Sequence, residues 1–353
     1  MRVKHREGKK LWHKSPCRLH AQPARKAGVT ETIVSYVINE NRYVDSEKCR
    51  RVKAAIKKLH YTPNTMARAL KGKKTNHILF IADDITGNHF GEIISEMDRI
   101  AYDKGYFISL CSDKNDKFFI QRIFERFFDG IIIASCTFSE QYIQNLIESQ
   151  IPVVLFKIRN YRTFKGKYGQ INTGLYEGAR LCVKALYEKG RRSLLFIDRL
   201  GEKPAGKISQ DERLRGFTDQ CKEFGLDFSS KHIVQNCADE TELIRKIEKR
   251  FSARNHPDGI FARTDSVACA AMQGIKQAGL LIPKDVSVIG FNNSPQCKYT
   301  VPRLSSIQIN RAKTAKYAVE LLEKLIDNNT DEKTTAFCLN MELHTELIIR
   351  ESL

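Results

Sequence analysis

The chain has 353 residues, 42% hydrophobic and 28% charged, so it is long enough for two or three domains and apolar enough to bury a core. This composition excludes a disordered chain, and no apolar run approaches the roughly 18–20 residues that a membrane helix needs. The net charge of +18 is uneven, because residues 1–77 hold 20 Lys and Arg against 5 Asp and Glu, whereas the rest hold 39 against 36.

The ten cysteines are scattered singly, and neither a Cys-x-x-Cys pair nor a Cys/His cluster with zinc spacing occurs. We therefore expect reduced thiols that serve mostly as small apolar residues. The basic N-terminus has no apolar stretch after it, so it does not read as a secretory signal. These observations predict a cytoplasmic protein with no metal and no cofactor.

Residues 24–63 carry a pattern typical of a helix-turn-helix. Thr30 is a good N-cap for a helix over residues 31–39, in which Val34, Val37 and Ile38 share one buried face. In this motif the start of the second helix faces base edges in the major groove. The residues expected to face DNA are Thr30, Glu31, Thr32, Ser35, Tyr36 and Asn39.

A third helix is expected after Asp45, with Val52, Ala55, Ile56 and Leu59 at helical spacing and a Lys- and Arg-rich outer face. Residues 64–71 are basic and helix-compatible but shorter than the roughly 12–15 residues of a stable isolated helix, so they would order only on a partner surface. The charge of residues 1–77, a net of +15, predicts contact with the phosphate backbone of double-stranded DNA.

This head resembles that of the lactose-repressor (LacI/GalR) family, through residues 27–29, 34–39, 59–64 and 67–70. By this resemblance residues 64–71 form a hinge helix, followed by a linker to residue 77. Two hinge helices pair in the minor groove of a pseudo-palindromic operator, and Leu70 is the wedge that unstacks a base step. Asn64, Arg68 and Lys71 are further expected DNA contacts.

Residues 1–23 depart from the family pattern. Pro23 stands where the family has a buried Val or Ile, and proline inside a helix costs about 3 kcal/mol, although the first turn tolerates it. We therefore expect a divergent or frame-altered basic N-terminus that limits DNA binding.

Short apolar runs alternate with helical patterns through the core, residues 78–353. Strands are expected at 77–82, 106–111, 130–134, 152–156, 193–197, 232–235, 259–262 and 286–290. Helices are expected at 89–104, 117–127, 139–149, 176–189, 210–224, 239–253 and 265–278, and residues 158–173 read as irregular. This alternation predicts an α/β core of parallel sheets in two lobes, with ligands at the carboxyl ends of the strands.

The family resemblance continues in the core, most closely at residues 213–217, 256–265, 278–291 and 302–307. It implies a periplasmic-binding-protein-like core with two lobes joined by three crossings, and a homodimer. Lobe 1 would hold about 78–173 and 304–330, and lobe 2 about 174–303 and 331–353. By family position Arg213 and Asp265 line the effector cleft, and Asp84, His89 and Phe90 face it after the first strand.

These features predict a DNA-binding transcriptional regulator, a repressor of carbohydrate-use genes, whose effector is a sugar or sugar derivative. The core's net charge of only +3 favours a neutral or weakly charged effector. An enzyme is not expected, because the P-loop-like run 201–208 ends in Ile208, which cannot offer a hydroxyl to Mg²⁺. The alternative is a sugar sensor of the same core fold whose altered first helix no longer binds DNA by itself.

Overall fold

A computed structural model describes residues 20–39, 42–61, 74–83, 85, 88–114, 116–201, 211–327 and 337–353. The chain divides into two compact units, Met1–Thr75 and Asn76–Leu353. None of the described helices combines the length and the apolar character that crossing a membrane requires.

The described part of the first unit holds helices α1 (Ala21–Ala27), α2 (Glu31–Asn39) and α3 (Ser46–Leu59). Gly28 ends α1 in the left-handed region at φ 64°, which glycine adopts without steric cost, and so turns the chain toward α2. The Asp45 carboxylate caps α3 by accepting the backbone N–H groups of Glu47 and Lys48. The helices bury a small core of Ala24, Ala27, Val34, Val37, Val52 and Ala55. The predicted helix-turn-helix is confirmed.

Pro23 lies inside α1, in its first turn, and is buried. The first backbone N–H groups of a helix have no acceptor within the helix, so the N–H that proline lacks costs no hydrogen bond here. Pro23 is therefore compatible with helix α1, as its place in the first turn allows, and the limit that residues 1–23 set on DNA binding stays a prediction. Helix α1 begins within residues 1–23, the segment predicted to be divergent, and residues 1–19 lie outside the described residues.

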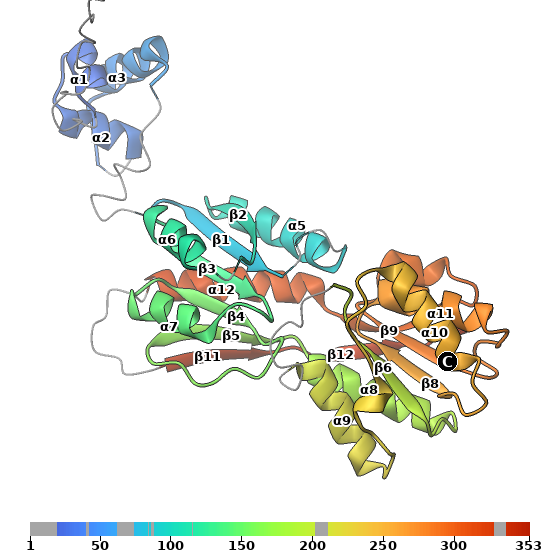
Figure 1. Ribbon diagram of the computed structural model, residues 1–353. Coiled ribbons are helices and arrows are strands. Elements are labelled where there is room, and N and C mark those ends of the chain that lie inside the picture. Colours follow the sequence, from blue (N-terminus) through green and yellow to red (C-terminus); the bar gives the residue numbers. More distant parts are fainter. Residues whose placement is uncertain are drawn as a thin grey trace, which may run out of the picture. The chain divides into compact units, whose positions relative to one another are not determined.

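The second unit contains two sheets, each covered by helices on both faces (Figure 1). The first sheet has the order β11-β5-β4-β3-β1-β2, and all its pairings are parallel. Its strands are β1 (His77–Ala82), β2 (Phe107–Ser112), β3 (Gly130–Ala134), β4 (Val153–Phe156), β5 (Lys167–Asn172) and β11 (Phe337–Glu342). Its helices are α5 (Asn88–Asp103), α6 (Lys117–Glu125), α7 (Glu140–Glu148) and α12 (Arg311–Asp327).

The second sheet has the order β12-β10-β9-β8-β6-β7, with β12 antiparallel to β10 and the other pairings parallel. Its strands are β6 (Leu194–Ile197), β7 (Ile233–Val234), β8 (Gly259–Ala262), β9 (Ser287–Phe291), β10 (Ser305–Ile309) and β12 (Thr345–Ile348). Its helices are α8 (Leu175–Glu188), α9 (Glu212–Glu223), α10 (Glu240–Phe251) and α11 (Asp265–Gln277), with the short 3-10 turns η2 (Ser230–His232) and η3 (Pro295–Lys298).

Side chains that alternate along each strand separate the two faces of each sheet. In the first sheet, Phe80 and Ile132 pack with the apolar residues of α5 and α12, whereas Leu79 and Ile131 pack with those of α6 and α7. In the second sheet, α8 and α9 cover one face and α10 and α11 the other. Strands buried on both faces have near-continuous apolar sequences, which is why these runs were predictable.

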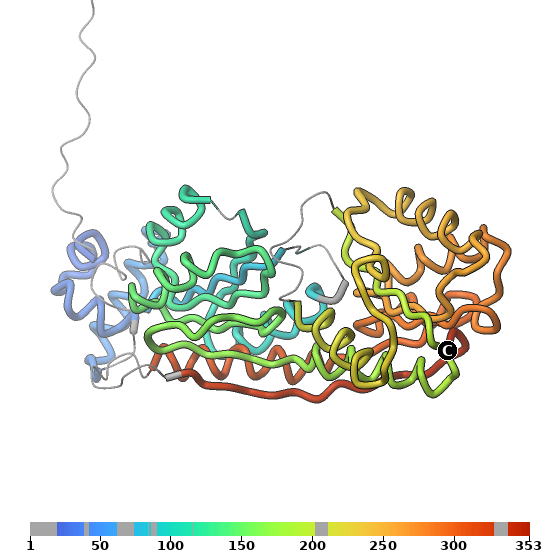
Figure 2. Tube along the Cα trace, turned by 60° about the horizontal axis from the view of Figure 1, so that its bottom comes forward, coloured from blue at the N-terminus to red at the C-terminus, as the bar shows by residue number. Residues whose placement is uncertain are grey.

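The chain crosses between the lobes three times, after β5, after β10 and after β11. Figure 2 shows the C-terminal segment running along one lobe and into the other. Two predicted lobe assignments are wrong. Strand β10 was expected in lobe 1 but pairs with β9 of lobe 2, and β11 was expected in lobe 2 but pairs with β5 of lobe 1. The crossings therefore fall near residues 310 and 343, not 304 and 331. The stretch 158–173 is not wholly irregular, because it contains β5.

Candidate functional site

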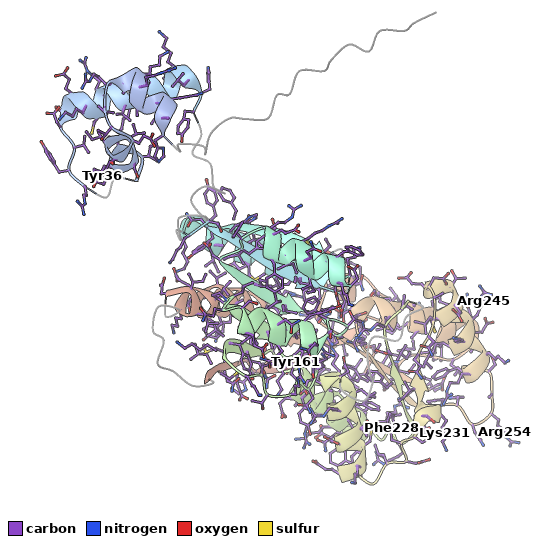
Figure 3. All side chains as sticks on the ribbon, turned by 60° about the vertical axis from the view of Figure 1, so that its left-hand side comes forward. Tyr36, Tyr161, Phe228, Lys231, Arg245 and Arg254 are labelled. Atoms are coloured by element: carbon purple, nitrogen blue, oxygen red, sulfur yellow. The ribbon has the colours of Figure 1, made fainter. Side chains whose placement is uncertain are left out.

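The exposed face of the head is basic. Helix α2 buries Val34 and Val37 and leaves Thr32 exposed and Glu31, Ser35 and Tyr36 partly exposed, as a major-groove face requires. All the basic side chains described in α1, α3 and the intervening segment are exposed: Arg25, Lys26, Arg42, Lys48, Arg50, Arg51, Lys53, Lys57 and Lys58. The guanidinium of Arg42 lies 5.3 Å from the centre of the Tyr36 ring, which is labelled in Figure 3.

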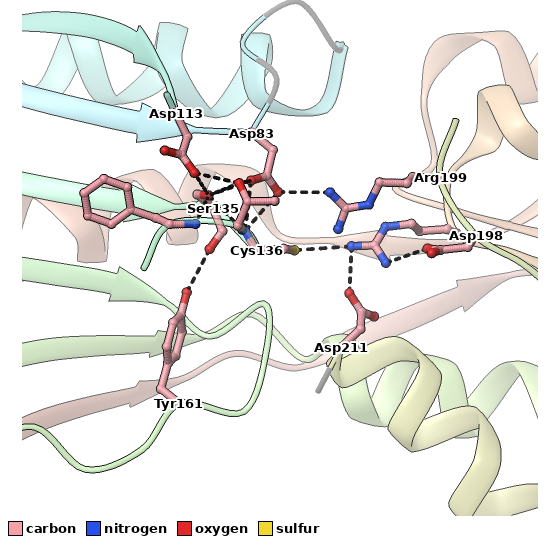
Figure 4. A network of polar contacts seen from close by, with 11 residues as sticks. Asp83, Asp113, Ser135, Cys136, Tyr161, Asp198, Arg199 and Asp211 are labelled. Atoms are coloured by element: carbon pink, nitrogen blue, oxygen red, sulfur yellow. Dashed lines mark hydrogen bonds and ion pairs between the residues drawn. The ribbon is translucent and has the colours of Figure 1, made fainter. Parts of the chain in front are cut away.

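In the core, a cluster of polar groups follows the carboxyl ends of the first-sheet strands (Figure 4). Both oxygens of the Asp83 carboxylate, after β1, accept the backbone N–H of Cys136 at 3.0 and 2.9 Å. The hydroxyls of Ser135 and Thr137, after β3, lie between Asp83 and Asp113, at 2.5 to 2.9 Å from both carboxylates. Burial alone would raise the pKa of Asp83, but the hydrogen bonds of Ser135 and Cys136 and the charge of Arg199 outweigh it and lower that pKa.

The facing wall of lobe 2 is built around Arg263, which follows β8. Its guanidinium forms ion pairs with Asp198, after β6, at 2.9 Å and with Asp211 at 2.7 Å, and all three side chains are buried. Asp211 also caps α9 by accepting the backbone N–H groups of Arg213 and Leu214. Burial would raise the pKa of Asp211, but the charges of Arg263 and Arg213 hold it below its ordinary value.

Direct contacts join the two walls. Arg263 Nη2 donates to Cys136 Sγ at 3.4 Å, and Arg199 Nη1 lies 3.5 Å from Asp83 Oδ2. Beside them, the backbones of Arg159 in lobe 1 and Asp211 in lobe 2 form an isolated antiparallel β-bridge. The cleft at the strand ends is thus bridged by side chains of the protein itself.

Unlike Arg199 and Arg263, Arg213 lies within ion-pair distance of no carboxylate among the residues that the structure describes. It is buried, its guanidinium lies 4.8 Å from the centre of the Phe291 ring, and its Nε has no hydrogen-bond partner among the residues that the structure describes. Burial, followed by the charge of Arg263, lowers the pKa of Arg213 to about 10. Such a desolvated donor group is suited to a ligand that brings acceptor oxygens.

Known proteins match both units. Residues 24–64 match the lacI family of bacterial regulatory proteins, and residues 183–353 match the periplasmic binding protein-like domain. The chain belongs to the lacI family. Its head is that family's DNA-binding domain, and its core is the effector-binding part of a transcriptional regulator.

Relatives of this lacI-family chain span nearly its whole length. The HTH-type transcriptional repressor PurR of Vibrio vulnificus (strain CMCP6) is 29% identical over 335 residues, which cover 93% of this chain and 96% of that protein. PurR of Yersinia enterocolitica serotype O:8 / biotype 1B (strain NCTC 13174 / 8081) is 28% identical, covering 93% and 95%. These relatives are transcriptional regulators.

Solved structures show the same fold. The lac repressor dimer bound to operator and the anti-inducer ONPF superposes with a TM-score of 0.77, at 20% identity, over 96% of this chain and 99% of that one. A complex of the transcriptional regulator CelR with cellobiose gives a TM-score of 0.63, at 22% identity, over 96% and 100%. The predicted α/β fold and family are confirmed.

The residues predicted to bind the effector in this lacI-family core differ from one another in their surroundings. Arg213 lies in the cleft, whereas Asp265 begins α11 and uses both carboxylate oxygens within the protein, accepting Ser306 Oγ at 2.5 Å and the backbone N–H of Ser294 at 2.6 Å. Burial raises the pKa of Asp265. Phe90 is partly buried and meets Phe80 edge to face. Asp84 and the side chain of His89 lie outside the described residues.

Sequence reasoning missed most of the cleft's polar groups, namely Asp83, Asp113, Ser135, Thr137, Asp198, Arg199 and Arg263. Each follows an apolar run directly or within three residues, so the rule that ligands bind at the carboxyl ends of parallel strands would have selected them. The predicted DNA contacts Asn64, Arg68, Leu70 and Lys71 fall outside the described residues, as does the side chain of Asn39.

Replacing Asp265 tests whether its hydrogen bonds to Ser294 and Ser306 stabilise the fold. Asp265→Ala should lower the free energy of unfolding by about 2 kcal/mol without any effector, because two buried donors lose their acceptor. Ser266→Ala, at an exposed position next to it, should stay within roughly 0.5 kcal/mol of the wild type. Urea unfolding followed by circular dichroism measures both. An Asp265→Ala protein as stable as the wild type would show that these hydrogen bonds contribute nothing.

Proposed function

We propose that this regulator is a repressor that binds a pseudo-palindromic operator as a homodimer and responds to a small polyhydroxylated effector, a sugar or sugar derivative, in the core cleft. It is not an enzyme, and it works in the cytoplasm, where its DNA lies. The observation that carries the proposal is the cleft itself, in which carboxylates of lobe 1 face guanidinium groups of lobe 2.

The chemistry of the cleft favours such an effector. The Asp83 and Asp113 carboxylates accept hydroxyl hydrogens, and the buried Arg213 guanidinium donates to ring or carbonyl oxygens. A polyhydroxylated molecule satisfies both kinds of group at once. Asp265 remains a proposed ligand of the effector, as do Asp84, His89 and Phe90.

The effector and the bridging contacts compete for the same groups. A ligand that bonds to Asp83 replaces the contact between Arg199 and Asp83. The lobes then adopt the relative arrangement that binds the ligand best. A ligand shifts DNA affinity only through its different affinity for the two arrangements, and such coupling is usually about 1–3 kcal/mol.

An exposed apolar edge on lobe 1 supports the homodimer. Strand β2 is at the edge of the first sheet, where Phe107 is 66% and Leu110 41% exposed, and Tyr102 of α5 meets Phe107 edge to face. Unpaired edge strands with large apolar side chains are open to pairing with another chain. We propose that a second copy covers this edge.

The head supports DNA binding over the alternative of a sensor that has lost it. Helix α1 forms despite Pro23 and packs on α3, so the helix-turn-helix is complete. Thr30, Glu31, Thr32, Ser35, Tyr36 and Asn39 are the proposed major-groove residues. Leu70 is the proposed minor-groove wedge, with Asn64, Arg68 and Lys71 beside it.

Operator binding should depend steeply on salt. With about 6–10 phosphate contacts, affinity should fall roughly 10³–10⁵-fold between 50 and 200 mM salt, because each contact releases counterions. Fluorescence anisotropy of a labelled operator measures this, with a random duplex as control. Binding that is indifferent to salt, or as tight on the random duplex, would contradict the proposal.

Arg213→Gln should abolish the effector response and spare DNA binding. The wild type should gain thermal stability with one member of a panel of sugars and sugar derivatives, and Arg213→Gln should lose that gain while keeping operator affinity within about twofold. Arg215→Gln, two residues along α9 and ion-paired with Glu212, is the matched control and should respond like the wild type. Full ligand stabilisation of Arg213→Gln would remove Arg213 from the effector site.

A further inference from the structure

A second concave site lies in lobe 2, at the edge of the sheet opposite the cleft. It is a cavity of about 410 Å³, within the range of small-molecule sites. Its walls come from residues just before β6 and β8, from η2 and from the end of α10. The cleft groups follow the carboxyl ends of β6 and β8, whereas these residues precede the amino ends, so the two sites are separate.

Arg250 lines this cavity and forms no ion pair with a carboxylate among the residues that the structure describes. Arg250, near the end of α10, is partly buried, and its Nε has no hydrogen-bond partner among the described parts of the chain. Burial lowers its pKa. A desolvated guanidinium is stabilised by an anion that brings acceptor oxygens to it.

Other donors line the same cavity. Ser193 offers a hydroxyl and Asn255 an amide. His232 Nδ1 accepts the backbone N–H of Ser229 at 3.1 Å, so the proton of the neutral ring is on Nε2. Lys231 adds an ammonium group that is shared with Asp227 at 3.2 Å. Figure 3 shows Lys231 at the lower margin of lobe 2.

The number and variety of these donors indicate the kind of anion. Three basic side chains, Arg192, Lys231 and Arg250, surround the cavity against one acidic side chain, Asp227. Arg192 is fixed in place, because Nη1 donates to the Tyr187 carbonyl at 2.8 Å and the guanidinium lies 3.7 Å from the centre of the Tyr187 ring. A carboxylate has two oxygens for these donors, whereas a phosphate group has three or four.

We propose that this cavity binds a small phosphate-bearing molecule. The site would give the regulator a second ligand, independent of the cleft effector and of the proposed function. Its volume of about 410 Å³ is that of a small-molecule site.

Isothermal titration of the full chain with pyrophosphate tests this site, at an ionic strength held near 150 mM with KCl. We expect one saturable site per chain, and weaker binding of inorganic phosphate at the same site. Arg250→Gln should weaken pyrophosphate binding about 10–100-fold, the usual effect of losing a charge-assisted hydrogen bond. Arg245→Gln, on the same helix but exposed and outside the cavity, should bind within twofold of the wild type.

Lys231→Gln provides a second test, because Lys231 is exposed and its loss leaves the fold intact. It should weaken binding severalfold. Absence of saturable binding, or equal weakening by Arg245→Gln, would overturn the site and show only diffuse attraction to basic surface. Loss of binding in Arg213→Gln, with Arg250→Gln unaffected, would place the anion in the cleft and also overturn it.

Discussion

The Arg263 guanidinium pairs with Asp198 and Asp211 inside lobe 2 and also donates to the Cys136 thiol of lobe 1. All these groups are buried, and removing one partner of a buried ion pair typically costs about 3–5 kcal/mol because the other charges stay uncompensated. Asp211 in turn caps α9, the helix that carries Arg213. The position of the buried Arg213 guanidinium therefore depends on the Arg263 ion pairs.

The remaining cleft chemistry follows from the sheet topology. Parallel strands end at a common edge, so the polar residues after β1, β2 and β3 gather on one wall and those after β6 and β8 on the other. The three crossings keep these walls opposed, and Arg311 joins them there by pairing with Glu92 of lobe 1 and donating to the Asn292 carbonyl of lobe 2. A ligand between the walls acts on the same contacts that hold the lobes together.

Local signals in the sequence were sufficient to predict most helices and strands. They were insufficient to predict which strands pair and what individual cleft residues contact. Helix α2 was predicted with its observed bounds because Thr30 and the Val34–Val37 spacing mark it locally. Strand β5 was missed because only Tyr168 and Ile171 of its six residues are apolar. The residues of β10 and β11 were assigned to the wrong lobes because tertiary contacts, not local sequence, decide which strands pair. The hydrogen bonds of Asp265 to Ser294 and Ser306 were likewise invisible, since they join residues about 30 to 40 positions apart.

We propose that contacts across the cleft set the affinity for DNA. The most direct measurement is the effector-free operator affinity of Arg199→Glu and Arg199→Gln, beside a random duplex. Arg199→Glu places a carboxylate against Asp83 and should change operator affinity about 5–30-fold, in the lower part of the usual coupling range. Arg199→Gln should change it less and in the same direction, with affinity for the random duplex unchanged. Operator affinities equal to that of the wild type in both variants would contradict the account.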